Sequence, residues 1–174
     1  MSEKLVVFSH GQDGEPWGAK IVAMADAARE LQFRAESVDY RGIADPVTRV
    51  GKLLAFCKEQ RAAPILVGSS MGGHVATAVS REVHARGLFL LAPAFYMPGY
   101  EQFTPRPAEC PMTIVHGWRD DIVPIDNSVR YAREYRATLH AIDADHRMTA
   151  NLGDIVRFFK IFLDEVERKR GSAS

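Results

Sequence analysis

The sequence predicts an α/β protein: a three-layer sandwich in which about six strands, mostly or fully parallel, lie between helices. Three observations support this fold class. Short apolar runs alternate about six times with helical patterns along the 174 residues. No internal repeat, linker or shift in composition divides the chain, so a single domain over residues 1–174 is expected. Polar clusters follow the apolar runs, which is typical of sites at the carboxyl ends of parallel strands.

The strands are expected where the chain is apolar but too short to form a helix. The first run, Leu5-Val6-Val7-Phe8, is continuous and therefore typical of a strand buried on both faces. The other five strands are expected at residues 35–40, 65–67, 87–91, 112–115 and 139–142. Between the fourth and fifth strands, the proline-rich segment 92–111 disfavours a long helix.

Helices are expected between the strands, each with one apolar face. The first carries Ile21, Met24, Ala25, Ala28 and Leu31. The second opens at Asp45-Pro46, with Pro in its tolerated first turn, and presents Val47, Val50, Leu54 and Cys57. A third runs to about residue 84, and Asp126 caps a fourth that ends near residue 136. The last has an apolar stripe from Ile155 to Val166, and a frayed tail is expected at residues 169–174.

The composition is that of an ordinary soluble protein, with 47% hydrophobic and 25% charged residues. A formal net charge of zero gives no attraction to nucleic acid or to an anionic membrane. Cys57 and Cys110 are interpreted as reduced thiols, and no CxxC spacing indicates a metal or redox site. No cofactor is expected. The start of the chain lacks a signal-peptide pattern, so a cytoplasmic location is the default expectation.

One stretch, Gly68-Ser69-Ser70-Met71-Gly72-Gly73, has the pattern of a nucleophile elbow. It follows an apolar strand and precedes a helical run of small residues, and this strand–turn–helix setting gives the G-x-S-x-G spacing its meaning. The spacing selects Ser70 as the nucleophile, because Ser69 has Val67 two residues before it. Glycines are expected beside Ser70 because a Cβ there would clash with the neighbouring strand or helix.

A serine hydroxyl needs a base to take its proton, and the base needs a group that orients its ring. The chain offers such a set in the order Ser70, Asp120, His146, each after a different predicted strand. These three residues are therefore expected at one edge of the sheet. The backbone N–H of Met71, which follows the nucleophile at a helix N-terminus, is a candidate donor to the oxyanion of a tetrahedral intermediate.

Four motifs carry a resemblance that covers nearly the whole chain: the His10-Gly11 loop, the elbow, the His116-Gly117-x-x-Asp120-x-x-Val123-Pro124 segment and the terminal-loop His146. Together they resemble the α/β-hydrolase superfamily, in particular its compact, capless, bacterial-type serine hydrolases and esterases. The chain departs from larger relatives because it begins directly at the strand before the oxyanion loop. It also has no room for a cap domain.

The resemblance implies a role for several of these residues. Asp120 becomes the triad acid and His146 the base; the adjacent Asp121 is the rival acid and is otherwise interpreted as a solvated or turn-stabilising carboxylate. The second oxyanion donor becomes the backbone N–H of Gln12. The histidines before Gly11 and Gly117 are interpreted as structural, each fixing a loop through hydrogen bonds.

Substrate recognition leaves more alternatives open. An aromatic cluster after the fourth strand forms either a minimal lid and acyl pocket or plain packing at the sheet edge; its members are Phe95, Tyr96, Met97, Tyr100 and Phe103. Trp17 and Trp118 flank the predicted site loops and are candidate wall residues. Arg41, Arg119 and Arg147 also follow strands, where they serve either an acidic substrate or the solvated surface.

The leading hypothesis is a serine hydrolase that acts on small carboxylic esters or thioesters, without a metal. Perhydrolysis on the same triad is an alternative that the sequence does not separate from it. A binding protein on a hydrolase scaffold is a third, because a fold alone does not determine function. The expected partner is a small-molecule acyl substrate at an open, shallow site.

Overall fold

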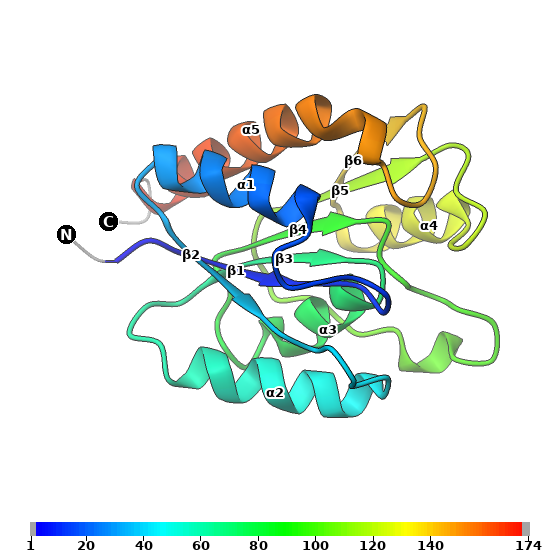
Figure 1. Cartoon of the computed structure of the whole chain (residues 1–174), viewed down its shortest axis with the longest axis horizontal. Coiled ribbons are helices and arrows are strands. Elements are labelled where there is room, and N and C mark those ends of the chain that lie inside the picture. Colours follow the sequence, from blue (N-terminus) through cyan, green and yellow to red (C-terminus); the bar gives the residue numbers. More distant parts are fainter. Residues whose placement is uncertain (1–2, 172–174) are drawn as a thin grey trace.

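The computed structural model describes residues 3–171, and in it a fully parallel six-stranded sheet lies between two layers of helices (Figure 1). The strand order is β2-β1-β3-β4-β5-β6. The strands are β1 (Leu5–Ser9), β2 (Arg34–Val38), β3 (Ile65–Ser69), β4 (Gly87–Leu91), β5 (Met112–Gly117) and β6 (Thr138–Ile142). The predicted fold class is therefore confirmed.

Helices cover both faces of the sheet. On one face lie α1 (Ala19–Glu30) and α5 (Leu152–Gly171), and on the other lie α2 (Pro46–Lys58), α3 (Met71–Ser80) and α4 (Ile125–Tyr135) (Figure 1). Two short 3₁₀ turns, η1 (Glu101–Phe103) and η2 (Thr149–Asn151), lie in the connections. Within the described residues, every helix is too short or too polar to cross a membrane.

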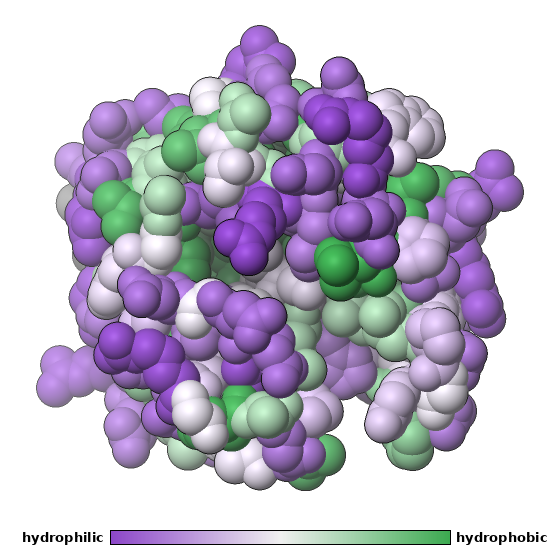
Figure 2. Space-filling view, turned by 45° about the vertical axis from the view of Figure 1, so that its right-hand side comes forward, coloured by the Kyte–Doolittle hydropathy of each residue, from purple (hydrophilic) through white to green (hydrophobic). Residues whose placement is uncertain are grey.

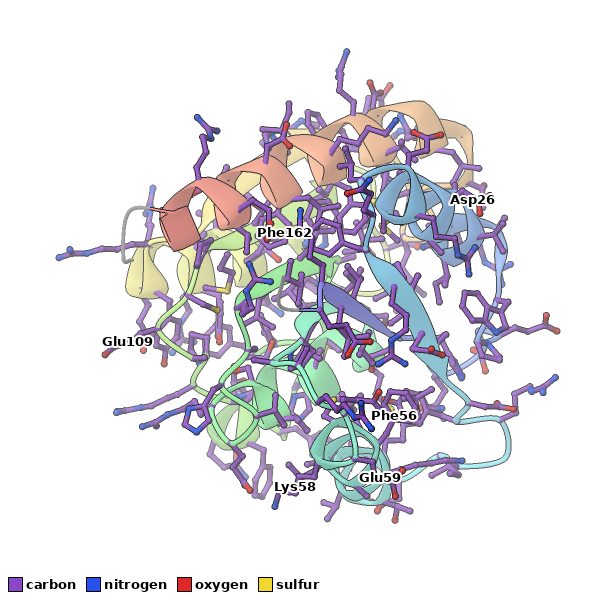
Figure 3. All side chains as sticks on the ribbon, turned by 90° about the vertical axis from the view of Figure 1, so that its left-hand side faces the viewer. Asp26, Phe56, Lys58, Glu59, Glu109 and Phe162 are labelled. Carbon is purple, nitrogen blue, oxygen red and sulfur yellow. The ribbon has the colours of Figure 1, made fainter. Side chains whose placement is uncertain are left out.

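The central strands are apolar without interruption because they bury side chains on both faces. In β1, Val6 and Phe8 enter the core under α1 and α5, whereas Leu5 and Val7 enter the core on the opposite face. Aromatic rings hold α5 to the sheet: Phe162 lies between α5 and the strands (Figure 3), with its ring centroid 5.4 Å from that of Phe89. Packing into both cores fixes where each strand ends relative to its neighbours.

The register brings the site loops to one edge. Ser9 at the end of β1 is level with Gly68, and Ser69 is level with Leu91 at the end of β4. The loops that follow β1, β3 and β4 therefore start side by side. This is the arrangement that positions residues far apart in the sequence for a common site.

The buried face predicted for α2 is confirmed in part, since Cys57 is buried and Val50 and Leu54 are half-buried and pack against the core. Val47 is 75% exposed, and the buried residues of this helix are Arg49, Leu53 and Cys57, four apart on one inward stripe. The prediction included Val47 and missed Arg49, because a pattern of apolar residues does not assign a charged residue to the inward face. The helix start was correct, since Asp45 caps it by accepting a hydrogen bond from the Thr48 N–H at 2.7 Å.

Three helix boundaries also differ from the predictions. The residue that precedes the first turn of α4 is Pro124, and Asp126 lies inside that turn, where its charge favours the helix N-terminus. Helix α3 ends at Ser80, because the Ser80 carbonyl accepts the Ala85 N–H at 2.9 Å and closes the chain into a turn. Residues 169–171, expected to fray, belong to α5, and residues 172–174 lie outside the described residues.

Candidate active site

Ser70 sits at the sharp turn between β3 and α3 with φ 54° and ψ −120°. A non-glycine residue rarely adopts such a conformation, so the surrounding contacts must hold it in place. The Ser70 N–H donates to the Leu91 carbonyl at 2.9 Å, and the Ser70 carbonyl accepts the N–H groups of Gly73 and Ala94, both at 3.0 Å. The strained backbone thereby holds the side chain of Ser70 at the end of its strand.

Two glycines make this turn possible. A Cβ on Gly68 would lie 2.4 Å from the carbonyl oxygen of Gly72, and a Cβ on Gly72 would lie 1.9 Å from the carbonyl oxygen of Ser9. Both neighbours are backbone atoms that cannot rotate away. The expectation that side chains at these positions would clash with adjacent elements is confirmed, and Gly72 also lets α3 approach the end of β1.

Ser70, His146 and Asp120 form a continuous chain of hydrogen bonds. The carboxylate of Asp120 accepts a hydrogen bond from His146 Nδ1–H at 2.7 Å. With Nδ1–H directed at Asp120, Nε2 faces Ser70, and in this tautomer the Ser70 hydroxyl donates to Nε2 at 3.1 Å. The residues follow β3, β5 and β6. His146 lies 76 positions after Ser70 and 26 positions after Asp120 in the sequence. The geometry is that of a nucleophile paired with a base.

The side chain of Asp120 is fully buried, yet both of its carboxylate oxygens have hydrogen-bond partners. Oδ1 accepts the N–H groups of Ile122 at 2.9 Å and Val123 at 2.8 Å, while Oδ2 accepts the proton of His146. Burial by itself would raise the pKa of Asp120, but the hydrogen bonds from His146, Val123 and Ile122 outweigh burial and hold that pKa below its ordinary value. The carboxylate is therefore ionised at neutral pH and can stabilise a charged imidazolium.

His116 is a second histidine on the same carboxylate, and the sequence did not assign it there. Its Nε2–H points at two acceptors, Asp120 Oδ2 at 3.0 Å and the Val123 carbonyl at 2.9 Å. Burial lowers the pKa of His116, so the ring is neutral and its Nδ1 accepts from the Ser128 hydroxyl at 2.7 Å. The signal that could have found this contact is the spacing of four residues between His116 and Asp120 around a tight turn.

The loop that carries His146 is tied to the loop that carries Asp120. The Trp118 N–H donates to the Ile142 carbonyl at 2.8 Å, and the Arg119 N–H donates to the Ala144 carbonyl at 3.0 Å. Gly117 permits this approach, because a Cβ there would lie 2.2 Å from the Ala144 oxygen. Asp145 accepts the Met148 N–H at 2.9 Å and shapes the loop around His146.

Two backbone N–H groups lie beside Ser70 without a hydrogen-bond partner within residues 3–171. One belongs to Met71, the first residue of α3, whose N–H has no carbonyl available within the helix. The other belongs to Gln12, in the loop after β1. Gly11 brings that loop against Ser70, since a Cβ on Gly11 would lie 3.4 Å from Ser70 Cβ.

Comparisons with known proteins identify the family of the chain. A model of the alpha/beta hydrolase family matches residues 6–168. The chain belongs to the alpha/beta hydrolase family. No curated protein sequence matches the chain significantly.

Solved structures of similar shape include a putative hydrolase of the alpha/beta superfamily from Xanthomonas campestris pv. campestris. It is 27% identical, with 94% of this chain and 99% of that chain covered and a TM-score of 0.87. Est1E from Butyrivibrio proteoclasticus is 20% identical, with 95% and 89% covered and a TM-score of 0.84. The Pyrococcus furiosus esterase Pf2001 is 15% identical, with 94% and 83% covered and a TM-score of 0.77. The latter two show a shared hydrolase fold.

The predicted substrate-contacting residues divide into buried and exposed groups. Phe95 is fully buried and stacks on Tyr131, with ring centroids 3.9 Å apart, so its ring belongs to the core. Tyr96 donates its hydroxyl to Glu134 at 2.9 Å and lies under the Arg130 guanidinium, and Met97 is half-buried. The plain-packing alternative therefore describes Phe95 and Tyr96.

Trp17 and Trp118 are the exposed candidates, at 42% and 61%. Tyr100 and Phe103 are exposed as well, with ring centroids 6.4 Å apart. The surface that includes the carboxyl ends of the strands carries scattered hydrophobic patches among hydrophilic side chains (Figure 2).

The arginines after the strands mostly have partners already. Arg41 forms a pair with Asp39 at 2.8 Å, and Arg119 forms a pair with Asp143 at 2.6 Å. Both pairs are exposed and contribute little to stability. Within the part of the chain that the structure describes, no group of three or more His, Cys, Asp or Glu side chains is placed to hold a metal ion. Cys57 and Cys110 are free, as predicted.

Proposed function

We propose that this alpha/beta hydrolase is a serine hydrolase that cleaves small carboxylic esters or thioesters through an acyl-enzyme. The observation that supports the proposal most is the hydrogen-bonded chain from Ser70 through His146 to Asp120. Its members are placed as nucleophilic catalysis requires: the hydroxyl lies within hydrogen-bonding distance of one imidazole nitrogen, and an ionised carboxylate contacts the other.

The reaction follows from these positions. Ser70 Oγ attacks the acyl carbon as its proton passes to His146 Nε2, and the carbonyl oxygen becomes an oxyanion. The N–H groups of Met71 and Gln12 donate to that oxyanion. His146 then gives the proton to the leaving alcohol or thiol. Water, deprotonated by His146, attacks the acyl-enzyme, releases the carboxylic acid and restores the Ser70 hydroxyl.

The substrate class is argued from what surrounds Ser70. The connection from β4 to β5, residues 92–111, contains only the 3₁₀ turn η1 among its regular elements, so no helical cap domain lies in it. An uncovered site of this kind suits short or exposed acyl groups better than long lipid chains, which need a buried apolar channel. The expected partner is a small acyl ester in solution.

The test combines a covalent probe with turnover. Wild-type protein is expected to label with a fluorophosphonate at one site per chain and to hydrolyse 4-nitrophenyl acetate and butyrate faster than the octanoate. Ser70→Ala is expected to lose labelling and turnover, whereas Ser69→Ala, one residue away, keeps both. Replacing water with hydrogen peroxide as acceptor measures perhydrolysis on the same acyl-enzyme.

Two results would contradict the proposal. Labelling that persists in Ser70→Ala would show that another residue is the nucleophile. Folded wild-type protein that neither labels nor turns over activated esters would favour the binding-protein alternative. A probe at the serine separates these two cases because it reports the nucleophile independently of the natural substrate.

A further inference from the structure

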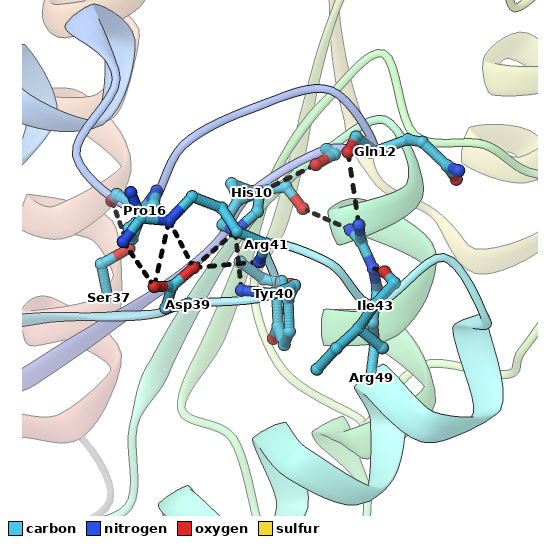
Figure 4. Close-up of polar contacts among 11 residues, drawn as sticks. His10, Gln12, Pro16, Ser37, Asp39, Tyr40, Arg41, Ile43 and Arg49 are labelled. Atoms are coloured by element: carbon cyan, nitrogen blue, oxygen red, sulfur yellow. Dashed lines mark hydrogen bonds and ion pairs between the residues drawn. The ribbon is translucent and has the colours of Figure 1, made fainter.

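Arg49 is a buried charge that the proposed reaction has not yet used. It projects inward from α2 and is only 1% exposed. Its Nε donates to the Ile43 carbonyl at 2.6 Å, which anchors the guanidinium to the loop between β2 and α2 (Figure 4). The two terminal nitrogens face the loop after β1, where they donate to the carbonyls of His10 at 3.3 Å and Gln12 at 3.4 Å.

Within residues 3–171, no carboxylate lies within ion-pair distance of Arg49. The guanidinium contacts backbone carbonyls and the ring of Tyr40, 5.1 Å away, and the charge of Asp13 acts on it only from beyond ion-pair distance. Burying a guanidinium without a counter-ion is costly, and an apolar side chain of similar length would fill the same space at lower cost. Leu53, one turn further along α2, shows that an apolar residue suits this face.

The two carbonyls that Arg49 contacts flank one particular peptide group. The carbonyls of His10 and Gln12 belong to the peptides before and after the Gly11–Gln12 peptide, which carries the Gln12 N–H. The carbonyl of that middle peptide, on Gly11, faces elsewhere: it accepts His10 Nδ1–H at 2.8 Å and the Gly14 N–H at 3.2 Å. In a trans peptide the N–H points opposite to the C=O, so these contacts set the direction of the Gln12 N–H.

The ring of His10 is itself fixed in one tautomer. The Tyr40 N–H donates to His10 Nε2 at 2.8 Å, so the proton of the neutral ring is on Nδ1, where it reaches the Gly11 carbonyl (Figure 4). Gly72 abuts the same loop from the other side, because a Cβ there would lie 2.6 Å from the His10 oxygen. The loop is thus held between α3 and the guanidinium of α2.

We propose that Arg49 is a positioning residue for the oxyanion donor at Gln12. Its planar fork holds the carbonyls on both sides of the Gly11–Gln12 peptide. Its positive charge lies behind the loop whose N–H donates to the oxygen on which negative charge develops. Both effects matter only when the tetrahedral intermediate forms. The inference rests on the proposed function, because it concerns how the proposed oxyanion donor is held.

The experiment compares Arg49→Met, which keeps the apolar stem and removes the donors and the charge, with Arg49→Lys, which keeps a charge but cannot span two carbonyls. Lys52→Met, on the exposed face of the same helix, is the matched control. Three quantities are measured: kcat/KM for 4-nitrophenyl acetate, the inhibition constant of a trifluoromethyl ketone that forms a hemiketal with the nucleophile, and the endpoint stoichiometry of fluorophosphonate labelling.

Displacing one oxyanion donor, rather than deleting it, is expected to lower kcat/KM by about 10- to 100-fold in Arg49→Met and about 10-fold in Arg49→Lys. The trifluoromethyl ketone is expected to weaken by a similar factor in each variant, because the hemiketal oxygen uses the same donor. Labelling is expected to reach one site per chain, more slowly, and Lys52→Met is expected to match wild type throughout.

The proposal is overturned if either folded Arg49 variant keeps the wild-type kcat/KM, or if the loss of activity equals the loss of labelled sites. The second result would mean that Arg49 only maintains the folded fraction. If Arg49→Met does not fold, Arg49→Lys alone decides. Failure of the proposed function gives a different outcome, since wild type and Ser70→Ala would then behave alike.

Discussion

Two His-Gly dipeptides end two strands at the same edge of the sheet, and the molecule uses them differently. His10-Gly11 follows β1 and His116-Gly117 ends β5. Both imidazoles are buried, and burial lowers the pKa of each. His10 places both ring nitrogens on backbone groups, whereas His116 places them on the side chains of Asp120 and Ser128 as well as on one carbonyl.

The glycines of the two dipeptides differ as much as the histidines. A Cβ on Gly117 would lie 2.2 Å from the backbone oxygen of Ala144, which is closer than real contacts allow. A Cβ on Gly11 would lie 3.3 Å from the backbone oxygen of Ser69 and 3.4 Å from Ser70 Cβ. These distances are short but close to ordinary van der Waals contact.

The difference separates two ways of building a site. The acid side, around Asp120, is a closed set of buried side chains in which every polar atom has a partner, so a change there alters chemistry or folding directly. The loop around Gln12, which we propose as the oxyanion side, is made of backbone groups that hydrogen-bond to His10 and Arg49 behind them. The order of expected effects follows from this contrast.

The largest effect is expected for Asp120→Asn. The two backbone N–H groups at Oδ1 require an oxygen there, so the amide nitrogen would occupy the Oδ2 position and face the N–H groups of His116 and His146. His146 can then pair only if its Nδ1 becomes an acceptor, which puts the proton on Nε2, facing Ser70, and leaves no base. A loss in kcat of about 10⁴-fold is expected.

Ester turnover at saturating substrate measures this effect, and Asp121→Asn is the matched control. Asp121 is adjacent and exposed, so its variant is expected to stay within about twofold of wild type. A loss smaller than about 10-fold in Asp120→Asn, or an equal loss in Asp121→Asn, would contradict the assignment of the acid.

Much of this site could be predicted from the sequence because its signals are local. A continuous apolar run such as residues 5–8 is diagnostic of a strand buried on both faces. Ser70 stands in a pattern of glycines whose reason is steric and short-range. The roles expected of Asp120 and His146 came from the order of motifs, and the structure brings both into hydrogen-bonding reach of one another.

What the sequence could not predict depends on contacts between distant segments. Arg49 interrupts the apolar periodicity of α2, and the two partners that link it to the loop after β1 lie 39 and 37 residues earlier, so no local pattern points to this contact. Phe95 belongs to an aromatic cluster whose composition fits a lid and a core equally well. Only its stacking on Tyr131 of α4 separates the two.

The second prediction compares the two glycines directly. Gly117→Ala is expected to lower the free energy of unfolding by about 3 kcal/mol, since the backbone of Ala144 must move. Gly11→Ala is expected to change it by less than about 1 kcal/mol, yet to lower kcat/KM by about 10-fold, because the new methyl displaces the loop beside Ser70. Urea unfolding and ester turnover measure the two quantities on the same samples.

Equal losses of stability in Gly117→Ala and Gly11→Ala would contradict the proposed difference between the two loops, because the loop after β1 would then be packed as tightly as the loop around Asp120. The proposed difference would also fail if Gly11→Ala kept full activity, since the loop after β1 would then tolerate displacement. Gly51→Ala, in the interior of α2 with open space around the added Cβ, is the control and is expected to be stabilising by about 0.5–1 kcal/mol.

The smallest effect expected is a shared pH dependence of stability. The pKa of His10 and that of His116 lie below the ordinary value of 6.5 because both rings are buried, so the folded state keeps them neutral where the unfolded state binds protons. Their stabilising contribution is complete above pH 6.5 and is lost as the pH falls toward the folded pKa values. Each ring adds up to about 1.4 kcal/mol per pH unit within that window.

Urea unfolding between pH 8 and pH 5 measures this slope in wild type and in His10→Asn and His116→Asn. Each variant is expected to lose stability less steeply than wild type below pH 6.5 and to run parallel to it above. Asp120 does not confuse the comparison, because its lowered pKa makes its contribution change only below its ordinary value of 3.8. If the pH dependence of the free energy of unfolding is the same in one variant as in wild type, the histidine replaced in that variant is protonated equally well in the folded and unfolded states. The two dipeptides would then differ in charge as well as in their partners.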